Sequence, residues 1–478
     1  MQADSAGFRF LVLFFNCMLT FGSYFCFDMP SVLQGQFQNA TCDPHNSTSN
    51  QSQHNQSCCD DCLGMSPDDY NLLYAIYAWT NAVIVIGAGF FIDKLGNRIG
   101  VLIFSFLCVL GSSTFAAGAF FKGSKGMLPL MLIGRLLFGS GNGSLTIVQN
   151  RITAFWFKDK ELAMAFGITL AFSRLGSVLN FLVTPNFATS YGLLWTLWGG
   201  AILCGLGFIS AIVVGLLDKF GLKQLGMDGA MESESRQLKV SDVKHLSLLY
   251  WLLILTIMFF YNGVFPFVAD ASKFIQDKYH YDSKTSAYMA GAVYDISMVL
   301  SPFLGFIIDR IGMRGYLASG CALLTIPVFG LLAFSNVHPL VSTLWLGVTY
   351  SFAASSMWPT IPLVVSANVV GTAFGLCTSL QMIGIGISNL IVGQILGGKD
   401  LPAEESVGRW RFVMIFLLAN TLACVAVSTI LNIIDKRRDG VLNQSKKEKL
   451  AKEELRQNVE EREPTETDPL LSGGNSIN

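Results

Sequence analysis

The chain has 478 residues, of which 52% are hydrophobic and only 14% are charged. A soluble globular protein carries about 25% charged residues, so this composition excludes that class. The formal net charge of −1 gives no electrostatic basis for binding nucleic acid. We therefore expect a protein that crosses a membrane several times.

Twelve apolar blocks follow one another along the chain, each about 20 residues long, which is the length that spans a bilayer as a helix. They lie at 10–28, 70–92, 100–120, 127–149, 161–183, 192–216, 248–268, 285–308, 316–335, 342–365, 370–396 and 411–434. The first block could instead belong to a cleaved signal peptide. Its long apolar part and the lack of a clear small-x-small cleavage site favour an uncleaved signal anchor.

The polar stretches between the blocks predict how the chain is divided. Six blocks precede the stretch 218–247 and six follow it, which predicts an N-terminal half at 1–217, a cytosolic linker at 218–247 and a C-terminal half at 248–434. Basic residues cluster in this linker and directly after the last block, so the positive-inside rule places both termini in the cytosol. The tail at 435–478 is charged and poor in apolar residues, which is typical of a disordered segment.

The loop 29–69 is expected on the opposite, lumenal side of the membrane. It carries four N-glycosylation sequons, at Asn39, Asn46, Asn50 and Asn55. It also holds four cysteines, Cys42, Cys58, Cys59 and Cys62. In an oxidising lumen these cysteines are expected to form two disulfides, and three pairings are possible. The alternative is a metal site on Cys59, Asp60, Asp61 and Cys62 with His45 or His54, which the oxidising compartment disfavours; we expect no metal and no cofactor.

A ten-residue motif, G-x-x-x-D-[K/R]-x-G-x-R, occurs twice in the chain, and the copies lie 216 residues apart. Its defining residues are Gly89, Asp93, Lys94, Gly96 and Arg98 in the first copy, and Gly305, Asp309, Arg310, Gly312 and Arg314 in the second. Internal repetition at half the chain length indicates a transporter built from two repeated halves. The motif resembles the loop signature of the major facilitator superfamily, which implies an all-α membrane fold with twelve transmembrane helices in two six-helix repeats.

Each copy of the motif closes an apolar block on the side expected to be cytosolic, where it predicts a gate. A carboxylate at 93 or 309 can cap a neighbouring helix or pair with a cation, and such a contact can form in one conformation and break in the other. The alternative is a plain tight turn with basic residues. The stretch 134–141 resembles the span-four arginine motif of the same superfamily, in which we expect Arg135 to have a structural role.

Two more ionisable residues, Arg174 and Asp295, lie inside apolar blocks. Such residues are costly in a bilayer and usually face a partner or a water-filled cavity. A two-half transporter binds its substrate near the midplane, so Arg174 and Asp295 could hold the two ends of a zwitterion. They could instead pair with each other, and Asp295 could carry a proton. The polar neighbours expected near the substrate are Tyr294, Asn81 and Gln381, with simple interhelical hydrogen bonding as the alternative. No ATP-binding motif and no catalytic constellation stands out, so we expect no enzyme.

Several segments resemble one family in more detail, the major facilitator superfamily domain-containing protein 1 family of lysosomal dipeptide transporters. These segments are 21–26 with Asp28 and Pro30, 73–75, 156–158 with 160–162, Arg174 with 176–177 and Asn180, 242–244, 265–267, 301–302 and 358–359. The resemblance implies passive export of dipeptides, notably cationic ones, from lysosomes, with Arg174 holding the dipeptide carboxylate. Where the family has a glutamate in span four, this chain has Gly143. We therefore expect Asp295 to supply the missing carboxylate.

The resemblance also implies partners. Members of this family depend on an accessory subunit, the glycosylated lysosomal membrane protein, and we expect a weaker dependence here because the chain carries its own dense glycan loop. Near the C-terminus, Glu466 precedes the pair Leu470 and Leu471, which resembles the acidic dileucine signal that clathrin adaptors read for lysosomal sorting. An idle pair of leucines is the alternative.

Three functions remain open at this stage. The first is alternating-access uniport of dipeptides or similar small zwitterions from lysosomes. The second is proton-coupled symport of a small organic anion, with Arg174 binding the anion and Asp295 carrying the proton. The third is a receptor or scaffold that keeps the transporter fold without transporting.

Overall fold

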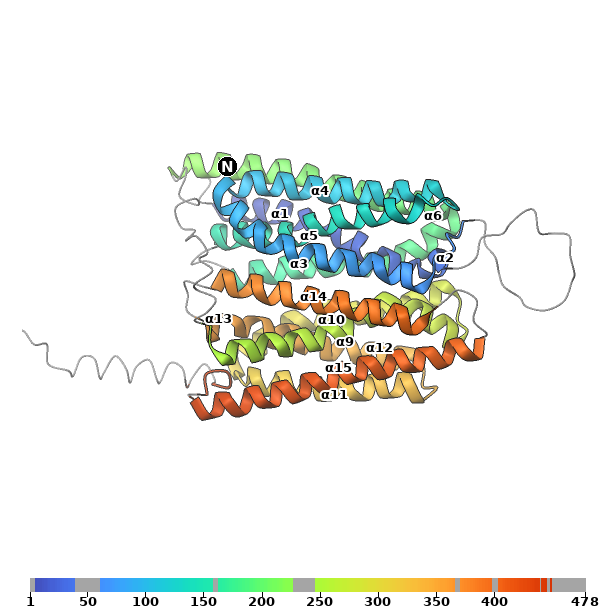
Figure 1. Cartoon of the computed structure of the whole chain (residues 1–478). Coiled ribbons are helices and arrows are strands. Elements are labelled where there is room, and N and C mark those ends of the chain that lie inside the picture. Colours follow the sequence, from blue (N-terminus) through green and yellow to red (C-terminus); the bar gives the residue numbers. More distant parts are fainter. Residues whose placement is uncertain are drawn as a thin grey trace, which may run out of the picture.

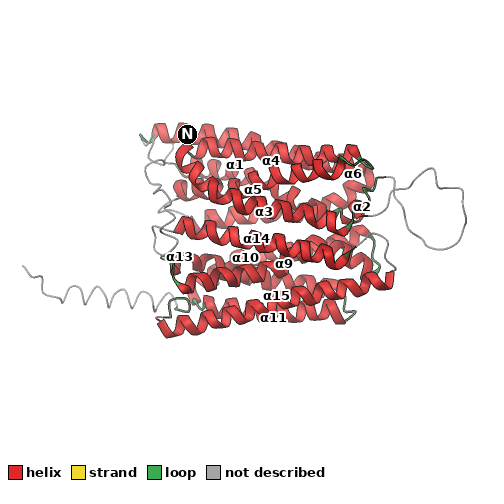
Figure 2. Ribbon diagram, viewed as in Figure 1, coloured by secondary structure: helices red, strands yellow, loops and turns green. Residues whose placement is uncertain are grey.

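The computed structural model describes residues 5–38, 61–157, 162–226, 246–365, 370–397, 403–438, 440–444 and 448. Every regular element in these residues is a helix (Figure 2). The first half contains α1 (Ala6–Val32), α2 (Gln34–Gln38), α3 (Pro67–Leu95), α4 (Asn97–Gly118), η1 (Ala119–Phe121), α5 (Met127–Phe157) and α6 (Leu162–Gln224). The second contains α9 (Leu248–Tyr279), α10 (Ser283–Ile311), α11 (Arg314–Phe334), α12 (Pro339–Met357), η2 (Trp358–Thr360), α13 (Ile361–Val364), α14 (Val370–Leu396) and α15 (Ala403–Arg438). The predicted all-α fold is confirmed.

All twelve apolar blocks lie on these helices to within a residue or two. The fifth and sixth blocks share the long helix α6, which breaks at Gly192 with a φ of 80°. Only glycine adopts that conformation without strain, and a Cβ at 192 would lie 2.6 Å from the Asp61 carboxylate. By length and composition, eight of the described helices could each cross a bilayer, with α6 counted once. The helices α5, α10 and α12 are not among these eight, and each carries several buried polar side chains.

The helices form two bundles that lie against each other (Figure 1). The elements up to α6 make one bundle, shown in blue to green, and the elements from α9 make the other, shown in yellow to red. The bundles meet mainly through α3 against α14 and α6 against α10, with smaller contacts from α1 and α2 to α9. A site between the halves is therefore lined by these helices.

Helix α1 continues past the end of its apolar block, which we had placed at residue 28. It runs to Val32 with Pro30 inside it, and α2 follows almost directly. Asp28, the last residue of that block, is consequently only 2% exposed. At the other end of that stretch, Ser66 and Asp69 form a capping box that starts α3 at Pro67.

Glycines bring α4 and α5 into backbone contact. A Cβ on Gly134 would lie 2.5 Å from the backbone nitrogen of Phe115, and a Cβ on Gly111 would overlap the backbone of Phe138. Further along α5, a Cβ on Gly141 would lie 2.6 Å from the carbonyl oxygen of Phe104. Small residues at such crossings let two helices approach closely in a bilayer.

At the end of the molecule where α2 lies, three side chains of the first half donate hydrogen bonds to α9. The Ser31 hydroxyl donates to the Val268 carbonyl at 2.5 Å, the Gln34 amide donates to the Asp270 carboxylate at 2.5 Å, and the Tyr70 hydroxyl donates to the Ala269 carbonyl at 2.8 Å. The halves are therefore tied together at this end. The neighbouring segment 61–66 is tied to α2 in turn, because Leu63 and Met65 donate their backbone N–H groups to the carbonyls of Gln36 and Phe37 at 2.9 and 2.7 Å.

Candidate functional site

Arg174, on α6, lies at the contact between the halves. Its Nη2 donates to the hydroxyl of Tyr350 on α12 at 2.5 Å. Its guanidinium carbon is 4.8 Å from the centre of the Tyr350 ring and 5.6 Å from that of Tyr294 on α10. Within the part of the chain that the structure describes, no carboxylate lies within ion-pair distance of Arg174. The guanidinium is thus held by two tyrosines and, among the described residues, has no counter-ion of its own.

Asp28, on α1, lies on the other side of Tyr294. The Tyr294 hydroxyl donates to Asp28 Oδ1 at 3.3 Å, while Oδ2 is buried without a hydrogen-bond partner. One tyrosine of the second half therefore lies between a cation and an anion of the first half. The sequence placed Asp28 among the segments that carry the family resemblance, but we did not predict it as a site residue.

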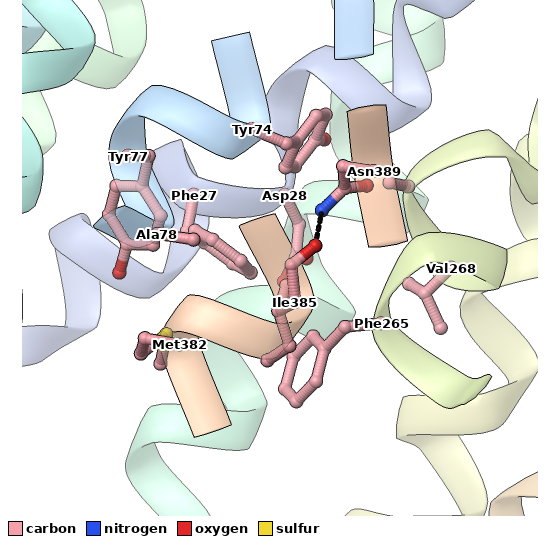
Figure 3. Close-up of a pocket in the computed structure, with 11 residues that line it drawn as sticks. Phe27, Asp28, Tyr74, Tyr77, Ala78, Phe265, Val268, Met382, Ile385 and Asn389 are labelled. Atoms are coloured by element: carbon pink, nitrogen blue, oxygen red, sulfur yellow. Dashed lines mark hydrogen bonds between the residues drawn. The ribbon is translucent and has the colours of Figure 1, made fainter. Parts of the chain in front are cut away.

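A pocket opens beside Asp28 between the two halves (Figure 3). Its walls come from α1, α3, α9 and α14 and are mostly aromatic and aliphatic, with Phe27, Tyr77 and Phe265 among them. Besides Asp28, the polar groups are Tyr74, Asn389 and the hydroxyl of Tyr77, which accepts from the Asn142 amide at 2.7 Å. The Asn389 amide nitrogen donates to the Ile385 carbonyl at 2.9 Å, drawn as a dashed line in Figure 3.

Gly143 does not face an empty space where an acidic side chain would fit. A Cβ at 143 would overlap the amide group of Asn81, which reaches across from α3. Asn81 is buried and its Oδ1 has no hydrogen-bond partner. The predicted substrate contact of Asn81 remains a prediction, but its side chain occupies the space next to Gly143.

This contact gives a packing prediction. Gly143→Ala should lower stability by about 1–3 kcal/mol because the added methyl group meets the Asn81 amide. Asn81→Ala combined with Gly143→Ala should recover most of that loss, which a double-mutant cycle of thermal unfolding in detergent would measure. Gly199→Ala is the matched control, since a Cβ there meets nothing within 4 Å. Equal losses in the single and double variants would contradict the packing.

The structure does not bring Asp295 to Arg174. Asp295 is half-buried on α10, and no hydrogen bond or ion pair involves it among the residues described. Its neighbour Tyr294 points to Asp28 instead, since adjacent residues of a helix project in different directions. Gln381, on α14, is buried. The substrate roles of Asp295 and Gln381 stay predictions.

Arg135 is enclosed by aromatic rings on α3, α4 and α5. Its guanidinium carbon lies 4.7 Å from the ring centre of Phe115, 5.5 Å from that of Tyr74 and 5.9 Å from that of Phe138. It is only 2% exposed, and its Nε and Nη2 have no hydrogen-bond partner. Cation–π contacts of this kind stabilise a desolvated cation. The setting supports the structural role expected for this residue.

The repeated motif ends a helix at a glycine with positive φ in both halves. Gly96 and Gly312 end α3 and α10 with φ values of 83° and 73°, which explains why glycine recurs at that place. Each donates its N–H to a carbonyl four residues earlier, Ile92 or Ile308, at 2.8 Å. The structure does not describe the side chains of Asp93 and Lys94 in the first copy, or those of Asp309 and Arg310 in the second. The gating role of these residues therefore stays a prediction.

The motif arginines have different partners in the two halves. Arg98 pairs with the buried Asp218 of α6 at 3.3 Å, and Trp156 donates to the other oxygen of that carboxylate at 3.1 Å. Arg314 instead donates to the Pro359 carbonyl at 2.9 Å. The repeated sequence therefore does not imply identical contacts.

Several predicted sites fall outside the described residues. These are Asn39, Asn46, Asn50, Asn55, Cys42, Cys58, Cys59, Glu466, Leu470 and Leu471. Cys62 is buried and disulfide-bonded. The pairing of the loop cysteines nevertheless stays a prediction, because the other three cannot be placed.

Comparisons with known proteins agree with the fold. The Major Facilitator Superfamily family model matches residues 10–389. The lysosomal dipeptide transporter MFSD1 of Danio rerio is 32% identical over 450 residues, covering 91% of this chain and 89% of that protein. The Homo sapiens protein of the same name is 31% identical over 458 residues, covering 92% and 89%.

Solved structures resemble the chain in fold alone. A bacterial homologue of the human lysosomal transporter Spinster, in an inward-facing and occupied conformation, has a TM-score of 0.63 at 15% identity and covers 92% of this chain and 100% of its own. The peptide transporter POT in complex with sulfate has a TM-score of 0.62 at 13% identity, covering 91% and 96%.

The helical fold, the paired bundles and the matched family model define a transporter of the major facilitator superfamily, not an enzyme. The protein crosses the membrane several times. Within that superfamily, the chain belongs to the MFSD1 family.

Proposed function

We propose that this chain exports dipeptides or similar small zwitterions from lysosomes by alternating-access uniport. The observation that carries the proposal is Arg174, a cation between the halves that is bonded to tyrosines and lacks a carboxylate partner among the described residues. A substrate carboxylate fits this place because guanidinium groups bind carboxylates with two parallel hydrogen bonds. The names of the MFSD1 relatives support a dipeptide as the carrier of that carboxylate.

The location of Arg174 suits alternating access. Its contacts run from α6 of the first half to α10 and α12 of the second. A substrate carboxylate that competes for the guanidinium would loosen its bond to Tyr350 and so change the contact between the halves. Binding energy at such a place can shift the balance between two arrangements of the bundles.

The test is uptake of a labelled dipeptide into proteoliposomes that contain the purified chain. Uniport predicts uptake that follows the dipeptide gradient and is unchanged by an imposed pH gradient. Proton-coupled symport is the second candidate, since buried Asp28 is linked to Arg174 through Tyr294. It predicts accumulation driven by the pH gradient. Absence of uptake of dipeptides and organic anions alike would contradict both.

The remaining proposals concern sorting and partners. Glu466 with Leu470 and Leu471 would direct the protein to lysosomes through a clathrin adaptor, which requires a cytosolic C-terminus. The glycan-bearing loop would reduce dependence on the glycosylated lysosomal membrane protein. Preference for cationic dipeptides follows from the family resemblance.

A further inference from the structure

We propose that Asp28, Tyr74 and Asn389 form the subsite for an ammonium group of the substrate. The inference rests on the proposed function, because it assigns the positively charged part of the same zwitterion. It replaces our expectation that Asp295 supplies the carboxylate missing at Gly143.

Three polar atoms at the pocket beside Asp28 are buried without a hydrogen-bond partner. They are Oδ2 of Asp28, the hydroxyl of Tyr74 and Oδ1 of Asn389. They come from α1, α3 and α14, so both halves contribute (Figure 3). Leaving such groups unpaired in a buried place costs free energy, and a ligand that donates to them would recover it.

The chemistry of these atoms selects a donor of several hydrogen bonds. Asp28 Oδ2 is a carboxylate oxygen, and the unpartnered atom of Asn389 is its carbonyl oxygen, while its amide nitrogen donates one of its two hydrogens to Ile385. The Tyr74 hydroxyl can accept as well. A primary ammonium group carries three N–H donors and no acceptor, which matches three acceptors with one negative charge. The aromatic side chains of Phe27, Tyr77 and Phe265 complete a pocket that favours a cation over a neutral polar group.

The other charged groups near the pocket do not occupy the proposed ammonium subsite. Arg135 lies near Asp28, yet it forms no hydrogen bond or ion pair with it among the described residues and is surrounded by rings. Asp270 accepts from Gln34 with one oxygen and leaves the other without a partner, but it does not line this pocket. At position 143 the space is filled by Asn81. Asp28 is therefore the carboxylate best placed to receive the ammonium group of a substrate whose carboxylate binds Arg174.

Tyr294 relates the two subsites. Its hydroxyl donates to Asp28, while its ring faces the guanidinium of Arg174. The anionic and cationic subsites thus lie on either side of one side chain, a spacing suited to a small zwitterion. A dipeptide has two possible sources of an ammonium group, its N-terminus and a lysine side chain.

The test measures binding of five ligands to the purified full chain by thermal shift and by competition for uptake. The ligands are Ala-Ala, N-acetyl-Ala-Ala, Ala-Ala amide, Lys-Ala and Nα-acetyl-Lys-Ala. The chain should bind Ala-Ala roughly tenfold or more tightly than its acetylated form. Asp28→Asn should bring that ratio close to one while keeping the preference for Ala-Ala over Ala-Ala amide, which reports the Arg174 subsite and an intact fold.

The outcomes separate the two proposals. If Asp28→Asn changes neither the ratio of Ala-Ala to N-acetyl-Ala-Ala affinity nor the affinity for Nα-acetyl-Lys-Ala, or if these are lost in Asp295→Asn instead, the ammonium subsite is overturned and dipeptide transport is left standing. Failure of the unmodified chain to bind or transport any of the five ligands overturns the proposed function itself. If Nα-acetyl-Lys-Ala binds tightly and loses that affinity in Asp28→Asn, the subsite is supported with the side chain as the source. If only ligands with a free N-terminus lose affinity in Asp28→Asn, the subsite is supported with the N-terminus as the source of the ammonium group.

Two further variants keep the test decisive if Asp28→Asn does not fold. Tyr74→Phe and Asn389→Leu each remove one of the remaining acceptors and should lower the ratio of Ala-Ala to N-acetyl-Ala-Ala affinity several-fold. Neither change adds or removes a formal charge. A ratio that stays at the value of the unmodified chain in both variants would overturn the proposal.

Discussion

Replacing Arg174 by lysine is expected to reduce dipeptide transport at least tenfold, although the positive charge is kept. Arginine presents a planar fork that can bond a carboxylate with two parallel hydrogen bonds, whereas an ammonium group acts as a compact point charge. Loss of one charge-assisted hydrogen bond costs about 1.5–3 kcal/mol, which corresponds to about a tenfold to 150-fold loss of affinity. Arg174→Ala should reduce dipeptide transport further, because it also leaves the Tyr350 hydroxyl without its hydrogen-bond donor.

The measurement is initial uptake of Ala-Ala into proteoliposomes, together with the ratio of affinities for Ala-Ala and Ala-Ala amide. That ratio should fall toward one in Arg174→Lys, since the carboxylate is the only difference between the ligands. Arg411→Lys on the exposed surface of α15 is the matched control. Normal uptake and an unchanged ratio in Arg174→Lys would refute the carboxylate subsite.

Replacing Gly134 by leucine is expected to prevent the protein from folding into a stable monodisperse form. The backbone of α5 touches that of α4 at this point, and a Cβ on Gly134 would lie 2.5 Å from the Phe115 nitrogen. A backbone atom cannot rotate away as a side chain can, so the two helices would have to separate. The separation would also disturb the rings of Phe115 and Phe138 that hold Arg135.

Fluorescence-detected size exclusion of the tagged protein measures this effect. Gly134→Leu should lose the monodisperse peak, and Gly134→Ala should keep it with a lower unfolding temperature. Gly205→Leu is the control, because a Cβ at that position of α6 meets nothing within 4 Å. A normal peak for Gly134→Leu would show that α4 and α5 can move apart at little cost.

Most of the fold follows from features that the sequence carries openly. Apolar block length predicts spanning helices, and the duplicated motif predicts two halves. In both copies a helix ends at a glycine with positive φ, at 96 and at 312. The ends of helices were less predictable. Asp28 borders a polar stretch and was assigned to a helix end, yet α1 continues to Val32 and buries it.

The candidate site was only partly predictable from the sequence, because tertiary packing decides which side chains meet. Arg174 and Tyr294 stand out, since a charged residue and its polar neighbours are rare in apolar blocks. Which face of a helix a residue occupies depends on tertiary packing, so Tyr294 and Asp295 could not be told apart by sequence alone. Asn389 is one of three side-chain amides in its apolar block, and only the fold brings it to the same pocket as Asp28 and Tyr74.

The segment 61–66 has a consequence for control of the transporter from outside the bilayer. Its backbone is bonded to α2, and α2 is bonded through Gln34 to Asp270 on α9. A protein that grips this segment would therefore resist the parting of α2 from α9. An external subunit could in this way slow the transport cycle without touching the substrate pocket. It would hinder the conformational change in which α2 separates from α9.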